Sequence, residues 1–154
     1  MSFAVIRVRG SVNVKGDIKD TLKMLRLHRV NHCVILPNTK TYVGMLQKVK
    51  DYVTWGEIEP ETLAKLIIHR GRISGDNKIS DGYIKKHSDY KSVMSFAKAV
   101  SKGEIGYKDI AGIIPVIRLH PPKKGYKGVK RSYQSGGALG YRGKNINALL
   151  ERMI

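Results

Sequence analysis

The C-terminal part of this sequence has almost no acidic residues. Between Asp109 and Glu151 there is none, and the whole chain has 29 Lys and Arg against 12 Asp and Glu, a formal net charge of +17. A surface that only has to be soluble mixes charges of both signs. The excess of one sign therefore predicts a polyanionic partner, and nucleic acid fits because each neutralised phosphate releases condensed counterions.

Cysteine and long apolar runs are also scarce. The single Cys33 excludes an internal disulfide and is typical of a reducing compartment, and its place in the run CVIL predicts a buried thiol. No apolar run approaches the length of a membrane-spanning helix, and MSFAVIRVRG is too short and too alternating for a signal peptide. We expect a cytoplasmic protein without membrane association, because the apolar stripes of its helices have core spacing.

The positive charge is unevenly distributed along the chain. Residues 1–56 carry a net +7, residues 57–114 only +2, and residues 115–154 a net +8. The middle segment has the balance of an ordinary soluble module between two basic ends. This distribution predicts either two contact surfaces or one composite surface.

The first 58 residues alternate between strand and helix patterns. Alternating apolar residues predict a strand over 3–9, with Arg7 and Arg9 on its mixed face. A helix capped by Asp17, the strand CVIL, a second helix capped by Thr39 or Thr41 and a strand over 54–58 follow. The order predicts an α+β layer with the helices on one face of the sheet.

The rest of the chain divides into a helical extension and a basic end. Over 59–114 we expect one helix from Pro60 to Gly71 and another from Ser92 to Gly103, joined by turns. Over 115–154 we expect a returning strand at 116–119, a basic Gly-rich segment after Pro121-Pro122, and a helix. The apolar stripe of that last helix must dock on the core, and it consists of Ile146, Leu149, Leu150 and Met153.

The titratable residues form no catalytic or metal-binding pattern. Nucleases that use metal ions need clustered carboxylates, whereas those of this chain are scattered. Asp76, Asp81 and Asp89 lack a calcium-loop spacing and suit turns and caps. No nucleophile stands beside a base, and the histidines lack metal-ligand spacing, so His28, His32 and His120 are expected in solvent or facing RNA. We expect no cofactor, no metal and no small-molecule substrate.

Three Gly-x-x-Gly tetrads occupy residues 125–128, 137–140 and 140–143. A KH domain clamps nucleic acid with such a tetrad between two helices, but no helical pattern flanks these. The glycines instead predict one flexible loop over 121–143 that becomes ordered on RNA. Within it, Tyr126, Tyr133 and Tyr141 either stack on bases or pack on protein.

The stretch DTLKMLRLHRVNHCVILPNTKTYVGMLQKVKDYV combines a helix of the type T-L-x-x-L-x-L, a strand, and a helix of the type M-L-x-x-V-x-x-Y-V. This combination resembles the core of the large-subunit ribosomal protein 30 family, whose eukaryotic members are called protein 7. The segments WGEIEPETLAKLIIHRGRI and GGALGYRGKNINALLERMI are similar to the long archaeal form. One departure is His32, where many members carry Gln or Thr. The matching positions are Thr21, Leu22, Leu25, Leu27, Arg29, His32, Val34, Met45, Leu46, Val49, Tyr52 and Val53.

The resemblance implies a ferredoxin-like α+β core and a non-catalytic role in the large ribosomal subunit. There the chain would bind ribosomal RNA near the 5S RNA region, beside neighbouring ribosomal proteins. A regulatory RNA-binding protein outside the ribosome is the alternative, and an RNA-processing enzyme is a weaker one. The residues themselves supply the candidate RNA contacts, which are basic side chains on polar faces and loops: Arg7, Arg9, Lys15, Lys23, Arg26, His28, Arg29, Lys48, Arg118, Lys123, Lys124, Lys127, Lys130, Arg131, Arg142 and Lys144.

Overall fold

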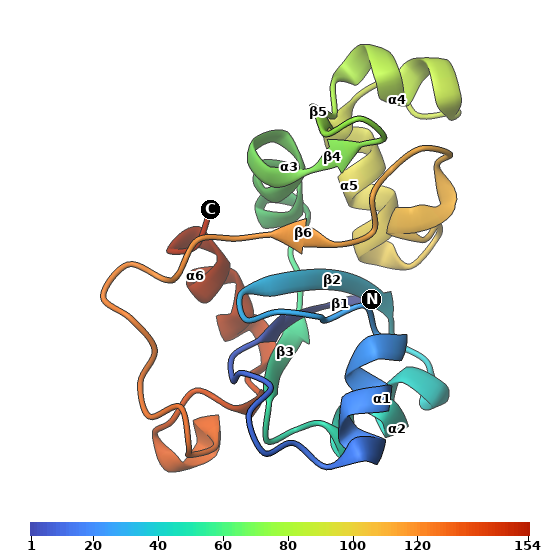
Figure 1. Cartoon of the computed structure of the whole chain (residues 1–154). Coiled ribbons are helices and arrows are strands. Elements are labelled where there is room, and N and C mark those ends of the chain that lie inside the picture. The colour runs from blue at the N-terminus through green and yellow to red at the C-terminus, as the bar shows by residue number, and fades with distance from the viewer.

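The computed structural model describes all 154 residues and is built on a five-stranded sheet with the order β6-β2-β1-β3-β7. The central strand β1 pairs antiparallel with both β2 and β3 (Figure 1). The predicted α+β class, with a ferredoxin-like core, is confirmed. The strands of this sheet are β1 (Ser2–Arg7), β2 (His32–Pro37), β3 (Val53–Glu57), β6 (Ile117–Arg118) and β7 (Gly140–Tyr141).

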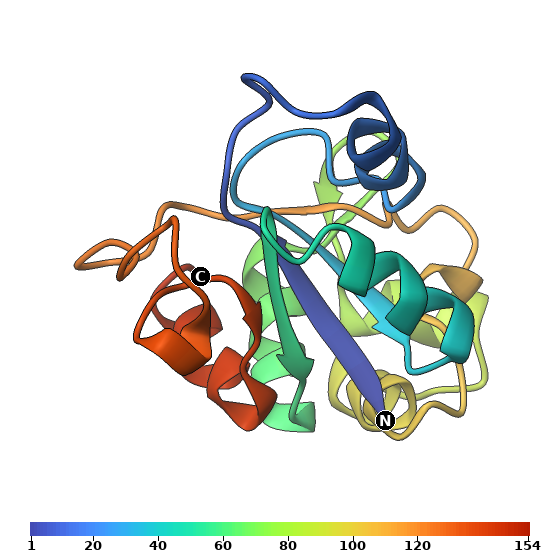
Figure 2. The same cartoon turned by 90° about the horizontal axis from the view of Figure 1, so that it is seen from below.

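Helices cover both faces of the sheet. The two helices of the first 58 residues share one face, as predicted, and helices from the rest of the chain cover the other. The helices α1 (Gly16–Met24) and α2 (Lys40–Lys48) lie on one face, in front in Figure 2. On the other face lie α3 (Pro60–Arg70), α5 (Val93–Lys102) and α6 (Ile146–Glu151). Phe3 and Val5 belong to the apolar core between the sheet and helices α1 and α2. Ala4 and Ile6 belong to the core between the sheet and helices α3, α5 and α6. The continuous apolar run FAVI is typical of a strand buried on both faces.

The helix ends follow the predicted caps. The hydroxyl of Thr39 accepts a hydrogen bond from the Tyr42 amide at 3.3 Å and so caps α2. Pro60 begins α3, and Gly103, with φ of +83°, ends α5. The start of α1 is the exception: the cap was predicted at Asp17, two residues late, because Lys15 is the N-cap residue and Asp17 lies in the first turn.

The segment between α3 and α5 is more structured than the expected turns. It forms a hairpin of β4 (Arg72–Ile73) and β5 (Asn77–Lys78), followed by α4 (Asp81–His87). The carboxylate of Asp81 accepts a 2.7 Å hydrogen bond from the amide of Val93, the first residue of α5. Only Ile84 of α4 is buried, so the sequence carries no apolar stripe that would have revealed this helix.

The C-terminal segment returns to the sheet at three places. As predicted, a strand packs back on the first module: β6 pairs antiparallel with β2. The strand β7 pairs parallel with β3, and the stripe of α6 is buried in the core that it shares with α3. None of the helices is both long and apolar enough to cross a membrane.

Residues 131–142 are folded, which corrects the expectation of one continuous loop over 121–143. The 3₁₀ turns η2 (Tyr133–Ser135) and η3 (Gly143–Asn145) flank β7. The amides of Gly137 and Leu139 donate to Ser132 and Arg131 at 2.8 and 3.1 Å. A Cβ on Gly137 would lie 2.1 Å from the Arg131 carbonyl oxygen, so this glycine permits the chain to fold on itself.

Candidate nucleic-acid interface

Several predicted cations meet at one end of the sheet. Because β1 is antiparallel to β2 and β3, the C-terminal end of β1 lies beside the N-terminal ends of its neighbours. The strand β6 ends there too, with Arg118 opposite His32. We call this surface the basic end, and it comprises Arg9, His28, Arg29, His32 and Arg118.

The cations of the basic end are not neutralised by the protein. Two ion pairs occur in the structure, Lys48 with Asp17 at 3.9 Å and Lys65 with Glu151 at 3.1 Å. Neither includes a member of the basic end. The positive charges there are therefore available to an anionic partner.

Arg7 is not part of this surface, which corrects its place among the candidate contacts. Its side chain is 3% exposed, and its guanidinium donates to the carbonyls of Leu27 and Arg9 at 2.7 and 2.9 Å and to the Ser11 hydroxyl at 2.9 Å. Burial lowers its pKa. Arg7 thus fixes the loops around the basic end and has little surface left for RNA.

Arg9, two residues further, lies half-buried on the surface. Its guanidinium stacks over the ring of Tyr52, 5.1 Å from the centroid, and one nitrogen donates to the Asp51 carbonyl at 3.4 Å. Stacking of this kind restrains an arginine while leaving most of its donors free. Arg9 is therefore restrained by the protein and keeps donors that no protein group uses.

His32 lies at the centre of the basic end. Burial lowers its pKa most, and the positive charges of Arg118, His28, Arg29 and Arg7 lower it further. Its Nδ1 is buried without a hydrogen-bond partner. The ring is consequently neutral in the free protein at neutral pH, and an anion beside it would favour its protonation.

Asn31 joins the basic end to the C-terminal segment, a role that sequence analysis missed. It has φ of +68°, a conformation that asparagine tolerates better than most residues. Its amide donates to the Arg7 carbonyl, its carbonyl accepts from the Leu119 amide, and its Oδ1 accepts from the Tyr126 hydroxyl at 2.6 Å. No pattern of neighbouring residues could have revealed contacts this distant in sequence.

The C-terminal segment presents five exposed cations beside this junction. The Gly125 position has no heavy atom within 4 Å of a would-be Cβ, so the chain there is open to solvent. The amides of Tyr126, Lys127, Val129 and Lys130 make no hydrogen bond within the protein. We call residues 123–131 the basic loop, and its exposed cations are Lys123, Lys124, Lys127, Lys130 and Arg131.

The three tyrosines of this segment pack on protein, the second of the two alternatives. Tyr126 bonds to Asn31, and the Tyr133 ring lies under the Arg142 guanidinium, 4.9 Å from its centroid. Tyr141 meets the ring of Phe3 edge-on at 6.5 Å. It also donates a hydrogen bond to the carboxylate of Glu57 and is 44% exposed.

Arg142, another predicted contact, is half-buried and held by hydrogen bonds within the protein. Its Nε donates to the Thr54 hydroxyl and its Nη2 to the Ala138 carbonyl, both at 2.8 Å. Burial lowers its pKa. Lys144, two residues on, is exposed.

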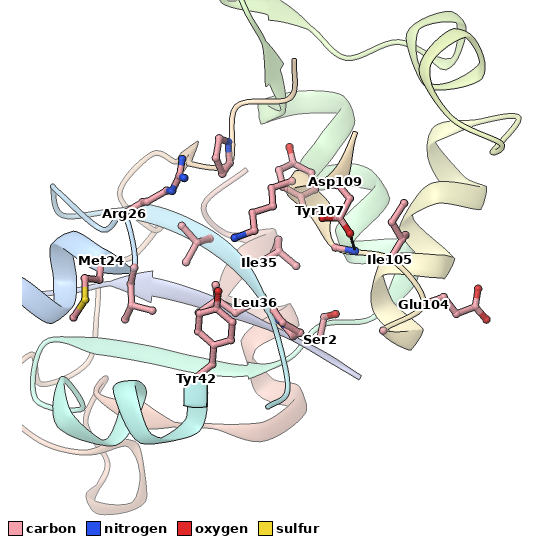
Figure 3. Close-up of a pocket in the computed structure, with 17 residues that line it drawn as sticks. Ser2, Met24, Arg26, Ile35, Leu36, Tyr42, Glu104, Ile105, Tyr107 and Asp109 are labelled. Atoms are coloured by element: carbon pink, nitrogen blue, oxygen red, sulfur yellow. Dashed lines mark hydrogen bonds between the residues drawn. The ribbon is translucent and has the colours of Figure 1, made fainter. Parts of the chain in front are cut away.

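The predicted cations of α1 and α2 lie on two different parts of the surface. Lys15 and Lys48 lie where α1 begins and α2 ends, and Lys48 is near Asp17. Lys23 and Arg26 lie at the C-terminal end of α1, where Arg26 lines a cavity of about 310 Å³ with Ser2 at the start of β1 (Figure 3). The structure does not bring these two to the basic end.

This cavity has no reactive arrangement. It is bounded by β2 and by the segment with the 3₁₀ turn η1 (Tyr107–Asp109), where the Asp109 carboxylate accepts a 2.8 Å hydrogen bond from the Gly106 amide (Figure 3). No group of three His, Cys, Asp or Glu side chains is placed to hold a metal ion. Burial raises the pKa of Cys33 to about 12, so its thiol stays protonated and unreactive, as predicted.

Comparison with known proteins gives a consistent result. The sequence model of "Ribosomal protein L30p/L7e" matches residues 3–53. The chain is 54% identical to the large ribosomal subunit protein uL30 of Methanoculleus marisnigri, over 98% of this chain and 99% of the relative. Identity to the proteins of the same name from Methanoregula boonei and Methanocella arvoryzae is 54% and 51%, with the same coverage. The chain therefore belongs to the ribosomal protein L30p/L7e family.

Proposed function

We propose that this protein is a structural constituent of the large ribosomal subunit and binds ribosomal RNA through the basic end and the basic loop. Its relatives over the full length are structural proteins of that subunit, and the protein is not an enzyme. The observation that carries the RNA-binding surface is the group of unneutralised cations around His32 and Arg118. A location near the 5S RNA, among other ribosomal proteins, is what the family resemblance supports.

The architecture suits a protein that positions RNA without reacting with it. Arg9 and Asn31 are fixed by contacts within the protein, so the cations of the basic end stand on a rigid support. The basic loop beside them makes few internal hydrogen bonds and can adapt to the backbone of a folded RNA. The fixed cations of the basic end would set the position of the RNA, and the adaptable cations of the basic loop would enlarge the area of contact.

We propose a narrower set of contacts than the sequence alone predicted. Arg7 and Arg142 serve the fold, and Lys23 and Arg26 lie away from the basic end. Lys15 and Lys48 flank the basic end on the side of α1 and α2. The proposed contacts are Arg9, His28, Arg29, Arg118, Lys123, Lys124, Lys127, Lys130, Arg131 and Lys144.

The test compares two triple variants with the same loss of charge. In R9Q/R29Q/R118Q the basic end loses three cations, and in K85Q/K86Q/K98Q the exposed faces of α4 and α5 lose three. Binding to large-subunit RNA is measured over a range of salt concentrations, with the 5S RNA titrated separately. We expect the plot of log affinity against log salt to be flatter by about 2 to 3 for the first variant alone.

Three results would each contradict a part of the proposal. Equal salt slopes for the two variants, with folding intact, would remove the basic end from the RNA interface. Recovery of most of the native protein away from large subunits after sedimentation would favour a regulatory RNA-binding protein outside the ribosome. Binding of large-subunit RNA without any preference for a fragment near the 5S RNA would overturn the proposed location only.

A further inference from the structure

A second cationic site lies where the helical extension meets the sheet. Arg70 ends α3, Arg72 begins β4 and Arg118 ends β6, and together they line a hollow of about 170 Å³. Ile114 and Val116 form its apolar part. Three arginines from three separate elements thus converge on one concavity.

The charges of this hollow are not compensated within the protein. Asp76 also lines it, but no carboxylate oxygen lies within 4.0 Å of any of the three guanidinium groups. Arg70 and Arg118 make no side-chain hydrogen bond at all, so their donors are free. Bringing three like charges together costs free energy, which a bound anion would offset.

Arg72 is already held in place. Its Nη1 donates to the carbonyl of Gly71 at 2.9 Å and more weakly to that of His69 at 3.4 Å. Its Nε and Nη2 make no hydrogen bond within the protein. A guanidinium fixed on one side and free on the other matches the geometry of phosphate oxygens.

The hollow is continuous with the proposed RNA surface, because Arg118 belongs to both. Across the β2–β6 pair this arginine faces His32 of the basic end. We propose that the hollow binds a phosphate group of the RNA backbone, so that the helical extension takes part in RNA binding through Arg70 and Arg72. This inference rests on the proposed function, and it adds a site within residues 59–114, where the sequence predicted none.

The first experiment measures RNA binding by R70Q/R72Q against a matched control. K85Q/K86Q removes two exposed cations from α4 of the same extension, outside the hollow. We expect R70Q/R72Q to lower affinity on the order of tenfold and to flatten the salt slope by about 1 to 2, with no comparable change in K85Q/K86Q. Because Arg72 also bonds to the backbone, Arg70→Gln alone is the second variant, with a slope flatter by about 1.

The second experiment uses inorganic phosphate as the probe and follows the arginine Nε–Hε signals of the wild-type full chain by NMR. Phosphate should shift the signals of Arg70, Arg72 and Arg118 more than chloride does at the same ionic strength. The absence of such a shift, together with R70Q/R72Q binding RNA as the control does, would overturn the site.

The two experiments separate the possible sources of the phosphate group. A phosphate-induced shift with RNA affinity equal to the control's would overturn the RNA backbone as ligand and assign the hollow to free phosphate. A wild-type protein that binds no ribosomal RNA would overturn the proposed function, whereas the arginine shifts would still support a phosphate site.

Discussion

Arg142 and Thr54 lie 88 residues apart in sequence and are joined by a 2.8 Å hydrogen bond from the arginine Nε to the threonine hydroxyl. That hydroxyl, fully buried, donates in turn to the Gly140 carbonyl at 2.8 Å. The Arg142 amide donates to the Trp55 carbonyl at 2.9 Å. One arginine therefore fastens the folded part of the C-terminal segment to β3.

We predict that Arg142→Ala lowers the free energy of unfolding by roughly 2 to 4 kcal/mol, because Thr54 and the Ala138 carbonyl lose a charged donor. Chemical denaturation measures this. Lys144→Ala is the control, since this exposed neighbour should change stability by about 0.5 kcal/mol or less. Equal stability of the two variants, with weaker RNA binding by Arg142→Ala, would instead make Arg142 a contact residue.

Gly56 in β3 should tolerate no side chain. A Cβ there would lie 1.9 Å from the Gly143 carbonyl oxygen and 3.1 Å from the Cβ of Ile146, so η3 and α6 would have to move. We predict that Gly56→Ala lowers the free energy of unfolding by roughly 3 kcal/mol. Thermal unfolding would show the loss as a lower midpoint.

Gly44 in α2 provides the matched control. It lies within the helix, and a Cβ there would have no heavy atom within 4 Å. Gly44→Ala should raise the free energy of unfolding by about 0.5 to 1 kcal/mol, because alanine loses less backbone entropy in a helix. A destabilised Gly44→Ala variant, or an unaffected Gly56→Ala variant, would contradict this assignment of close packing.

The elements that were predictable from sequence depend on nearby residues. Alternation and caps located β1, α2, α3 and α5, because a residue such as Thr39 or Gly103 acts within a few positions of itself. The helix α4 was missed because a single buried side chain, Ile84, gives no periodic pattern.

The candidate site was only partly predictable, because contacts distant in sequence decide which cations are free. Arg7 and Arg9 share one face of the strand pattern, yet the chain around Leu27 covers only Arg7. Likewise Arg142 and Lys144 have the same sequence surroundings, and only Arg142 meets Thr54. Composition predicted an anionic partner, but not which side chains are left to meet it.

His32 should make stability depend on pH. Burial, then the charges of Arg118, His28 and Arg29, lower its pKa below the ordinary 6.5, so below about pH 6.5 the unfolded chain binds a proton that the folded protein does not. The free energy of unfolding should therefore fall as the pH drops from about 6.5 towards the pKa of the folded state. Above pH 6.5 the ring is mostly neutral in both the folded and the unfolded state, so this loss of stability is absent. Denaturation of wild type and His32→Asn at several pH values measures it.

RNA should reverse the shift of His32, because phosphates at the basic end favour the charged ring. NMR titration of its ring proton should give a higher pKa in the complex than in the free protein.

For the measurement of stability against pH, the control variant is His69→Asn, an exposed position at the end of α3, which should keep the wild-type pH dependence of stability. If His32→Asn kept it as well, the basic end would not be its source.

The last prediction concerns two parts of the C-terminal segment that should exchange amide protons at different rates. In the free protein, the amides of Tyr133, Leu139 and Arg142 donate to backbone carbonyls at 2.7, 3.1 and 2.9 Å and should be protected. The amides of Lys127 and Lys130 in the basic loop have no acceptor within the protein and should exchange fast.

Bound RNA should slow the exchange of the basic loop and leave residues 131–142 nearly unchanged, because only the loop still has conformational entropy to lose. Hydrogen exchange with and without large-subunit RNA measures both parts in one experiment, and the strands β1 and β2 serve as the internal reference. Strong protection of residues 124–130 before RNA is added would show that the loop is already ordered. Fast exchange throughout 131–142 in the free protein would instead restore the original expectation of one flexible segment, ordered over its whole length by RNA.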